Sequence, residues 1–342
     1  MTTKMPMRVL IVGGGSIGER HLRTFQIAGA DVELCEPLSQ RRDELGERYS
    51  VRTHPDLDGV DLGIFGGVVI CTPAPLHVAM ALRAVDAGCN VLIEKPLSLD
   101  PIKEVPRLLG RVEEKKAVVG VAHIYRHMPG VEEVKKQISD GAIGAVKHVA
   151  CVSGQDFAAY RPAYRDTYYV NHETGGGAIF DAAVHFIDAI QWLVGPIDLV
   201  SCRAAHQAIP DSNTEDAVTM TLEFESGALG SFGMNQFQAN NEATLEFIGT
   251  KGTIRYRLPN HEVSLCLGVG DTKEEWTSQK FPLERDDAFV AQARTFLDAC
   301  RGIVDARCTV REAAVAASVC VAAHKSAVSR REEQVPEIST RL

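Results

Sequence analysis

Short segments rich in apolar and β-branched residues alternate with amphipathic segments through the first third of the chain. The candidate strands are Arg8–Val12, Asp31–Cys35, Val68–Cys71, Asn90–Ile93 and Val118–Ala122, and the sequences V-L-I-V, V-V-I-C and V-V-G-V within them are apolar throughout. Strands of a parallel sheet are covered by helices on both faces, so they are apolar throughout instead of alternating. Helical spacing between them is found at Ile17–Ala28, Gln40–Tyr49, Leu76–Asp86 and Arg107–Lys116. We therefore predict a doubly wound, parallel α/β domain over residues 1–123.

The pattern changes after His123, where most segments alternate between apolar and polar residues. Helical spacing is found at Pro129–Ser139 and Asp181–Leu193, and alternation at Leu199–His206, Ala217–Glu225, Leu229–Gln236, Ala243–Ile248 and Thr253–Arg257. Turn signals at Ser226-Gly227 and Lys251-Gly252 indicate hairpins. Residues 124–342 are thus predicted to form an α+β domain with a large, open, mostly antiparallel sheet. Two alanine-rich helices, Asp286–Arg301 and Thr309–Ser329, follow it, and we expect the tail Arg330–Leu342 to be mobile.

Length and charge are consistent with a two-domain globular protein that acts on small molecules. The chain has 342 residues, 45% of them hydrophobic, which at roughly 150 residues per domain gives about two domains. Its 36 basic and 45 acidic residues give a net charge of −9. Without a basic run, nucleic acid and anionic membrane are poor candidates as partners.

The cysteines and the N-terminus lead us to expect a cytoplasmic protein. The nine cysteines are scattered and form no C-x-x-C pair, so we interpret them as reduced thiols. The first residues contain no apolar segment of the kind that an export signal has. The stretch Leu62–Leu82 lacks Asp, Glu, Lys and Arg, but its glycines and prolines favour a buried strand, a turn and a helix over a membrane span.

A glycine-rich motif follows the first predicted strand. Gly13, Gly15 and Gly18 occupy the glycine positions of G-x-G-x-x-G, with Ser16 and Ile17 between the last two. The first glycine permits a tight turn, the second permits close approach of a pyrophosphate, and the third permits close packing of helix and strand. Alone the motif could be a turn without a ligand. Its place between a strand and a helix predicts a dinucleotide site.

Glu36, at the end of the second predicted strand, indicates which dinucleotide is bound. Its carboxylate can accept hydrogen bonds from both ribose hydroxyls, whereas the 2′-phosphate of NADP would meet repulsion there. NAD is therefore predicted, with NADP the less favoured cofactor. Arg41 and Arg42 follow closely, and either side chain could alter that preference or be a solvated charge on a helix.

Further candidate residues follow the next strands, at the carboxyl edge where this architecture binds ligands. Thr72 and Pro73 are expected to border the cofactor, and His77 either contacts it or caps the following helix. Glu94 and Lys95 end the next strand and precede Pro96. A lysine there can hydrogen-bond a substrate oxygen and stabilise developing negative charge, although an exposed lysine at a strand end is the alternative.

The second half contains Gly175-Gly-Gly, then Asp181, His185 and Asp188. On an α-helix these three side chains share one face, at i, i+4 and i+7. A histidine beside a carboxylate can serve as an acid or base, but a capping aspartate and a core histidine would give the same pattern. Metal binding would need a further ligand that the sequence does not indicate, so no metal is predicted.

Taken in order, the motifs resemble those of the Gfo/Idh/MocA family of NAD(P)-dependent oxidoreductases. The resemblance rests on the glycine loop, Glu94-Lys95-Pro96, Tyr125-Arg126-x-x-Pro129 and Gly175-Gly-Gly-x-x-x-Asp181-x-x-x-His185. It implies a Rossmann domain, a substrate-binding and oligomerisation domain, and C-terminal helices that return toward the first domain. It also implies that Lys95 binds substrate and assists proton transfer, that His185 is the acid/base with Asp181 as its partner, and that Arg126 lies at the edge of the site.

A segment rich in tyrosine and arginine supplies further candidates for substrate contact. Tyr160, Tyr164 and Arg165 can stack on a sugar or hydrogen-bond to it, and a purely structural loop is the alternative. The resulting hypothesis is an NAD-dependent oxidoreductase acting on a secondary hydroxyl or ketone of a sugar, polyol or sugar derivative. A redox-neutral, NAD-using glycoside hydrolase or lyase and a non-catalytic dinucleotide-binding regulator are the alternatives. An open sheet needs a cover, so we expect a homodimer or homotetramer.

Overall fold

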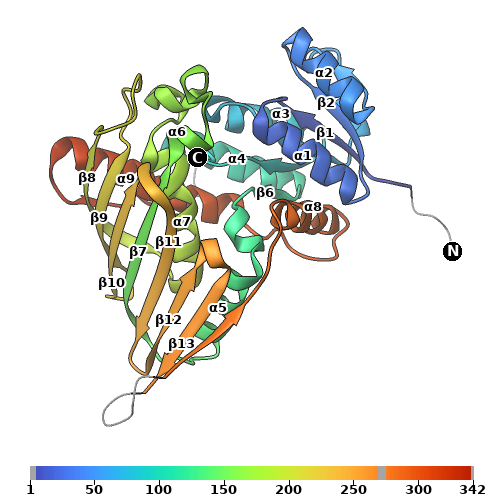
Figure 1. Ribbon diagram of the computed structural model, residues 1–342. Coiled ribbons are helices and arrows are strands. Elements are labelled where there is room, and N and C mark those ends of the chain that lie inside the picture. Colours follow the sequence, from blue (N-terminus) through green and yellow to red (C-terminus); the bar gives the residue numbers. More distant parts are fainter. Residues whose placement is uncertain (1–4, 269–274, 340–342) are drawn as a thin grey trace. The chain divides into compact units, whose positions relative to one another are not determined.

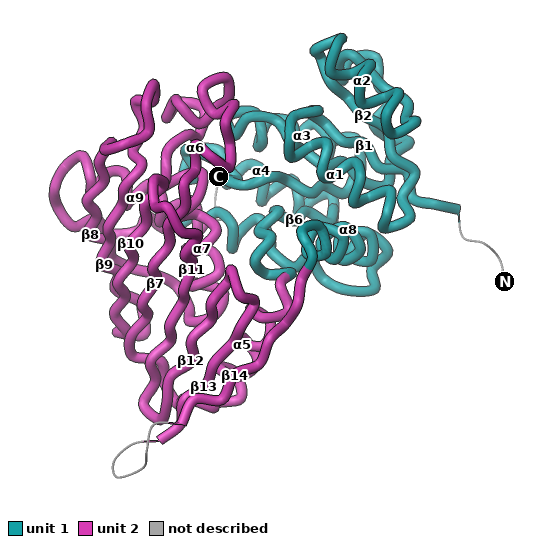
Figure 2. The backbone as a smooth tube through the Cα atoms, in the orientation of Figure 1, with its two compact units in different colours: residues 1–127, 284–314, 338–342 teal, residues 128–283, 315–337 magenta. Residues whose placement is uncertain are grey.

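A computed structural model describes residues 5–268 and 275–339. The chain divides into two compact units (Figure 2). The first contains Met1–His127, Glu284–Ala314 and Ile338–Leu342, and the second contains Met128–Leu283 and Val315–Glu337. The first of the two C-terminal helices therefore belongs to the same unit as the N-terminal residues.

The first unit is built on a six-stranded parallel sheet with the order β3-β2-β1-β4-β5-β6 (Figure 1). The strands are β1 (Arg8–Val12), β2 (Asp31–Cys35), β3 (Thr53–His54), β4 (Gly67–Ile70), β5 (Asn90–Ile93) and β6 (Val119–Val121). The strand order reverses beside β1, which pairs with β2 on one side and β4 on the other. Such a reversal creates a crevice at the carboxyl ends of the strands, where open α/β sheets bind ligands.

Helices cover both faces of this sheet, which explains its unbroken apolar strands. Val9 and Ile11 of β1 face α1 (Ser16–Ile27) and α8 (Asp287–Cys300), where they pack with residues such as Phe25. Leu10 and Val12 face the opposite way, in a core shared with α3 (His77–Asp86) and α4 (Pro101–Lys115). The remaining helix, α2 (Ser39–Tyr49), follows β2. Both side-chain orientations of β1 are thus buried.

The second unit contains a nine-stranded sheet with the order β14-β13-β12-β11-β7-β10-β9-β8-β15. Its strands are β7 (Val146–Asp156), β8 (Ile197–Ala205), β9 (Ala217–Phe224), β10 (Leu229–Asn235), β11 (Phe237–Gly249), β12 (Gly252–Arg257), β13 (Glu262–Leu267), β14 (Glu275–Lys280) and β15 (Glu333–Gln334). Only the β7–β10 pairing is parallel among these pairings. The predicted fold class, a parallel Rossmann-type sheet followed by a mostly antiparallel one, is confirmed.

Helices cover one face of this second sheet. α5 (Pro129–Ser139) packs on β12 and β13 and on α7 (Val184–Val194), which lies behind the strands in Figure 1. Along β9 the alternate residues Val218, Met220, Leu222 and Phe224 are buried, and those between them are mostly exposed. The alternation seen in the sequence therefore reflects a sheet with one covered face.

Several predicted elements need correction. Asp181–Leu193 is not one α-helix, because a π-helix (Ala178–Ala183) precedes α7. The helix predicted from Arg107 begins at Pro101 and contains Pro106. The strands β3, β7, β13, β14 and β15 were not predicted from the sequence. Because β15 pairs with β8, part of the tail that we expected to be mobile is a strand.

The apolar stretch Leu62–Leu82 contains a strand, a turn and the start of α3, as predicted. Within the described residues, one helical stretch, His172–Val194, has the length and composition to cross a membrane. The most apolar part of this stretch is 67% buried inside the fold, as in the core helix of a globular protein.

Candidate active site

The glycine loop joins β1 to α1 and leaves the start of that helix open. Gly13 has a φ of 99°, and a Cβ added there would lie 2.8 Å from the Cys71 carbonyl oxygen. A Cβ on Gly18 would lie only 1.8 Å from the Gly13 carbonyl oxygen. At Gly15, by contrast, an added Cβ would meet nothing within 4 Å, and no side chain caps the helix there. Gly15 and Ser16 are exposed, so this helix start fits a pyrophosphate.

The carboxylate of Glu36 is fixed beside the same loop. Glu36 follows β2 and is 6% exposed. Its Oε2 atom accepts a hydrogen bond from the Gly14 amide at 2.6 Å, and its Oε1 atom accepts one from the Leu38 amide at 2.8 Å. Each carboxylate oxygen can accept a further bond, so the residue fits the role of a ribose ligand.

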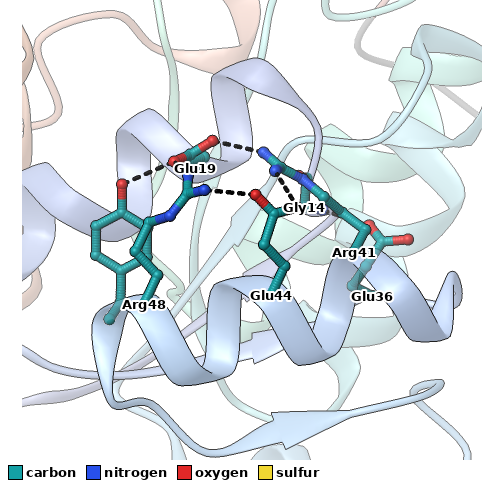
Figure 3. Close-up of polar contacts among 7 residues, drawn as sticks. Gly14, Glu19, Glu36, Arg41, Glu44 and Arg48 are labelled. Atoms are coloured by element: carbon teal, nitrogen blue, oxygen red, sulfur yellow. Dashed lines mark hydrogen bonds and ion pairs between the residues drawn. The ribbon is translucent and has the colours of Figure 1, made fainter.

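The two arginines after Glu36 are both held by oxygen atoms of the first unit. The Nε atom of Arg41 donates to the Gly14 carbonyl at 2.9 Å, and its terminal nitrogens bind the Glu19 and Glu44 carboxylates (Figure 3). Arg42 donates to the carbonyls of Glu36 and Pro37 at 3.0 and 3.2 Å. Both guanidinium groups are therefore engaged.

His77 connects the loop after β4 to the loop after β5. It is 1% exposed, and its Nδ1 and Nε2 atoms lie 2.8 Å from the Pro96 carbonyl and 2.7 Å from the Thr72 carbonyl. Burial lowers the pKa of His77, and the hydrogen bonds with the Thr72 and Pro96 carbonyls partly offset that shift. No side-chain bond caps α3. The histidine thus fixes the backbone around Thr72, Pro73 and the cis Lys95–Pro96 peptide.

Glu94 is bound to helix α1 and to the next residue. Its Oε1 atom lies 2.7 Å from Nε2 of His21, and its Oε2 atom accepts from the Lys95 amide at 3.0 Å. Burial alone would raise the pKa of Glu94, but the hydrogen bond with His21 and the positive charge of Lys95 keep that pKa below its ordinary value. The carboxylate is therefore ionised and holds the backbone of half-buried Lys95. The sequence analysis did not identify His21, which has no motif of its own.

In the second unit, Asp181 and His185 lie on either side of the junction between the π-helix and α7. Both are half-buried, whereas Asp188 is 1% exposed. A π-helix has wider turns than an α-helix. The i, i+4 and i+7 spacing that predicted one shared face for Asp181, His185 and Asp188 therefore does not apply to this segment. The hydroxyl of Tyr168 donates to Oδ1 of Asp181 at 2.6 Å. Tyr168 belongs to the tyrosine-rich segment that the sequence suggested for substrate contact, but it was not one of the three residues singled out there.

Glu215 fixes the start of the π-helix. Its Oε1 atom accepts from the Ile179 amide at 2.8 Å, and its backbone carbonyl accepts from the Ala178 amide at 2.9 Å. The preceding residue, Gly177, has a φ of 92°, and a Cβ there would lie 2.6 Å from both Glu215 carboxylate oxygens. Burial raises the pKa of Glu215. This buried carboxylate therefore supports the segment that carries Asp181.

The other predicted substrate contacts differ in exposure. Arg126 is 2% exposed and donates to Glu312 at 2.7 Å and to the Arg307 carbonyl at 3.0 Å. Tyr164 is 1% exposed, and its hydroxyl donates to the Pro210 carbonyl at 2.7 Å. Arg165 pairs with Asp211 at 2.7 Å, and Tyr160 is 56% exposed.

These contacts indicate different uses for the residues of that segment. Tyr164 and Tyr169 pack with Phe157 in a small core of their own. Tyr164 therefore has a packing role, and Arg126 links residues of the first unit that lie far apart in the sequence. Tyr160 and Tyr168, the latter 44% exposed, have side chains that a ligand can reach.

Comparison with known proteins gives a consistent result over both units. Residues 7–123 match the model described as "Oxidoreductase family, NAD-binding Rossmann fold", and residues 131–255 match the GFO/IDH/MocA C-terminal domain. The chain is 27% identical over 292 residues to the levoglucosan dehydrogenase of Pseudarthrobacter phenanthrenivorans, covering 72% of this chain and 73% of the relative. It is 26% identical over 309 residues to inositol 2-dehydrogenase 3 of Saccharopolyspora erythraea, covering 86% and 85%.

Solved structures show the same fold. A levoglucosan dehydrogenase in complex with NADH has a TM-score of 0.88 at 22% identity, covering 97% of this chain and all of the other. An oxidoreductase domain protein from Kribbella flavida has a TM-score of 0.86 at 21% identity, with 98% of this chain covered. The predicted enzyme class and the NAD cofactor are confirmed by the family match. The chain belongs to the GFO/IDH/MocA family of NAD-binding oxidoreductases.

Proposed function

We propose that the protein is a dehydrogenase that uses NAD to oxidise a secondary hydroxyl of a sugar, polyol or sugar derivative, or reduces the corresponding ketone. The observation that carries the proposal is the Glu36 carboxylate, which is hydrogen-bonded to the Gly14 amide beside an open helix start. That arrangement suits a dinucleotide without a 2′-phosphate. The substrate class is supported by relatives named levoglucosan, inositol 2- and D-glucoside 3-dehydrogenase.

The proposed reaction divides the work among three side chains. When bound, NAD supplies the acceptor for the hydride that leaves the substrate carbon. His185 takes the proton of the substrate hydroxyl, and Lys95 donates a hydrogen bond to the same oxygen. Asp181 orients the substrate and the histidine, and its own position is fixed by the Tyr168 hydroxyl. Glu94 and His77 act as positioning residues, because they hold the backbone on either side of Lys95.

Two further properties belong to the proposal. The uncovered face of the second sheet has exposed apolar side chains, among them Val152 at 54% and Leu229 at 50%. We propose that a second copy covers this face in a homodimer or homotetramer, which sedimentation would show. All nine cysteines are free thiols, which supports a cytoplasmic location.

The experiment is a screen of sugars and cyclic polyols in the presence of excess NAD, with reduced nicotinamide as the readout. We expect turnover with at least one compound that carries a ring secondary hydroxyl, and none with the matching deoxy compound. Dinucleotide binding without turnover of any such compound would contradict the proposed activity and favour a non-catalytic regulator.

A further inference from the structure

Two acidic side chains hold Arg41 beside the dinucleotide site. We propose that Glu19 and Glu44, here called the Arg41 tether, deny this arginine to the 2′-phosphate of NADP and so form a second determinant of cofactor choice besides Glu36. The inference rests on the proposed function only in that the glycine loop binds a dinucleotide. It assigns a role to residues that belong to none of the motifs.

The position of Arg41 gives the first argument. Arg41 and Glu36 contact the same residue from different elements, because Nε of Arg41 donates to the Gly14 carbonyl and Oε2 of Glu36 accepts from the Gly14 amide. The guanidinium group is therefore a neighbour of the carboxylate assigned to the ribose hydroxyls (Figure 3). An arginine near this carboxylate position is what NADP-binding Rossmann domains use to accommodate the extra phosphate.

The hydrogen bonds of Arg41 give the second argument. Its Nη1 atom donates to Glu44 at 3.1 Å, and its Nη2 atom donates to Glu19. Glu19 also accepts hydrogen bonds from Arg48 and from the Tyr49 hydroxyl. Although burial alone would raise the pKa of Glu19, these three bonds hold that pKa below its ordinary value. Glu19 is therefore charged at neutral pH, and Arg41 must leave two carboxylates before it can bind a phosphate.

The charge of the whole cluster gives the third argument. Glu19, Glu44 and Glu36 carry three negative charges, and Arg41 and Arg48 carry two positive ones. Arg42, the remaining cation next to Glu36, donates to the backbone carbonyls of Glu36 and Pro37. With Arg42 counted, the formal charges of these six side chains cancel. The cluster therefore offers a 2′-phosphate no net positive field although it contains three arginines, all of them engaged.

A mutant cycle tests whether the tether acts through Arg41. The double variant Glu19→Gln/Glu44→Gln is made in the parent chain and in Arg41→Gln, and the Kd of NADPH and of NADH is measured by nicotinamide fluorescence without turnover. In the parent, we expect the double variant to bind NADPH about tenfold more tightly, the value of one charge-assisted hydrogen bond, and NADH to change by less than about threefold. In Arg41→Gln, the gain for NADPH should vanish.

Controls separate this effect from a general change of charge or fold. Glu47→Gln neutralises an exposed carboxylate on α2, the helix that carries Arg41 and Glu44. It should leave the ratio of the Kd values for NADPH and NADH unchanged. If Glu19→Gln lowers thermal stability, Glu44→Gln alone is the variant to use, because Glu44 is exposed and its replacement disturbs no packing. This single variant should still bind NADPH more tightly than the parent does, by a smaller factor than the double variant.

Several outcomes would overturn the inference. They are a gain for NADPH that persists without Arg41, no gain in any tether variant, and an equal loss of affinity for both cofactors. A parent chain that binds neither cofactor would instead contradict the dinucleotide site on which the proposed function rests.

Discussion

At the scale of single residues, the candidate site is organised by carboxylates that bind backbone amides. Glu36 binds Gly14, Glu94 binds Lys95, and Glu215 binds Ile179. A charged acceptor forms stronger hydrogen bonds than a neutral one and fixes the backbone that it contacts. Glu36 and Glu94 were found from the sequence because each follows a strand. Glu215 and His21 were not, because their contacts join residues that no short motif connects.

Replacing Glu36 tests the first of these carboxylates. Glu36→Ser should narrow the preference for NAD over NADP by about 1–3 kcal/mol, because hydrogen bonds from ribose hydroxyls to a charged acceptor are lost. The ratio of kcat/KM for the two cofactors measures the change. A parent enzyme that already prefers NADP would show that Arg41 or Arg42 controls the pocket instead.

Replacing Lys95 tests the proposed chemistry. Lys95→Ala should nearly abolish turnover and leave the Kd of NADH within about threefold, because the lysine is assigned to the substrate oxygen more than to the cofactor. Lys103→Ala, which removes an exposed lysine of α4, is the matched control and should keep both values. Normal turnover of Lys95→Ala would refute the assignment.

At the scale of elements, the accuracy of the sequence analysis depended on where each element is buried. β1, β2 and β5 were predicted to the residue. In β1 and β5 the reason is a continuous apolar sequence, as expected for strands covered on both faces, whereas β2 also contains Asp31 and Glu33. β14 was missed because all of its described side chains are exposed, and the two-residue strands β3 and β15 are defined only by their partners. The central strand β7 was missed because its burial alternates irregularly.

The π-helix (Ala178–Ala183) arranges the candidate catalytic residues of the second unit. Glu215 binds the first two amides of this helix. The relative orientation of Asp181 and His185 therefore depends on a contact with a residue far along the chain and not on helical periodicity alone. Sequence spacing could therefore identify the two residues but not their relative orientation. Such π-helical turns are frequent at functional sites.

The role of Glu215 can be tested by two substitutions of different size. Glu215→Ala should lower the free energy of unfolding by about 1–3 kcal/mol, because it leaves the buried Ile179 amide without its acceptor, and it should also lower turnover. Glu215→Gln keeps a carbonyl acceptor and should preserve more of both. Chemical denaturation and kcat are the measurements, with the exposed Glu225→Gln as control. Equal behaviour of the alanine and glutamine variants would contradict this role.

The same residue predicts a pH dependence of stability. Burial raises the pKa of Glu215 above its ordinary value of 4.5, so the folded chain binds this proton more tightly than the unfolded chain does. Its stabilising contribution is complete below the unfolded pKa and is lost as the pH rises through the folded pKa. Glu215→Gln cannot titrate, so its stability relative to the parent should increase with pH across this window. A constant difference from about pH 4 to pH 8 would argue against a raised pKa.

At the scale of the whole molecule, the family match establishes an NAD-binding oxidoreductase but leaves two overall reactions open. Net dehydrogenation and a redox-neutral cleavage would both begin with Lys95, Asp181 and His185 acting on a substrate hydroxyl. A cleavage reaction also needs an acid and a base for its second step. Of the described polar groups near Asp181, Tyr168 is engaged with Asp181 itself and Glu215 with the Ile179 amide, and the sequence motifs supply no further acid/base pair. We therefore expect net dehydrogenation.

The balance of cofactor against product separates the two reactions. With substrate and excess NAD, a dehydrogenase accumulates one NADH for each molecule of substrate oxidised, because the hydride stays on the nicotinamide. In the redox-neutral reaction the hydride returns to the substrate, so a catalytic amount of NAD suffices and no NADH accumulates. We expect equal amounts of ketone and NADH, measured by chromatography and absorbance, and no cleavage product at substoichiometric NAD. Cleavage of a glycoside at substoichiometric NAD would refute net dehydrogenation. If that cleavage were lost in Lys95→Ala, the reaction would still be assigned to the same residues.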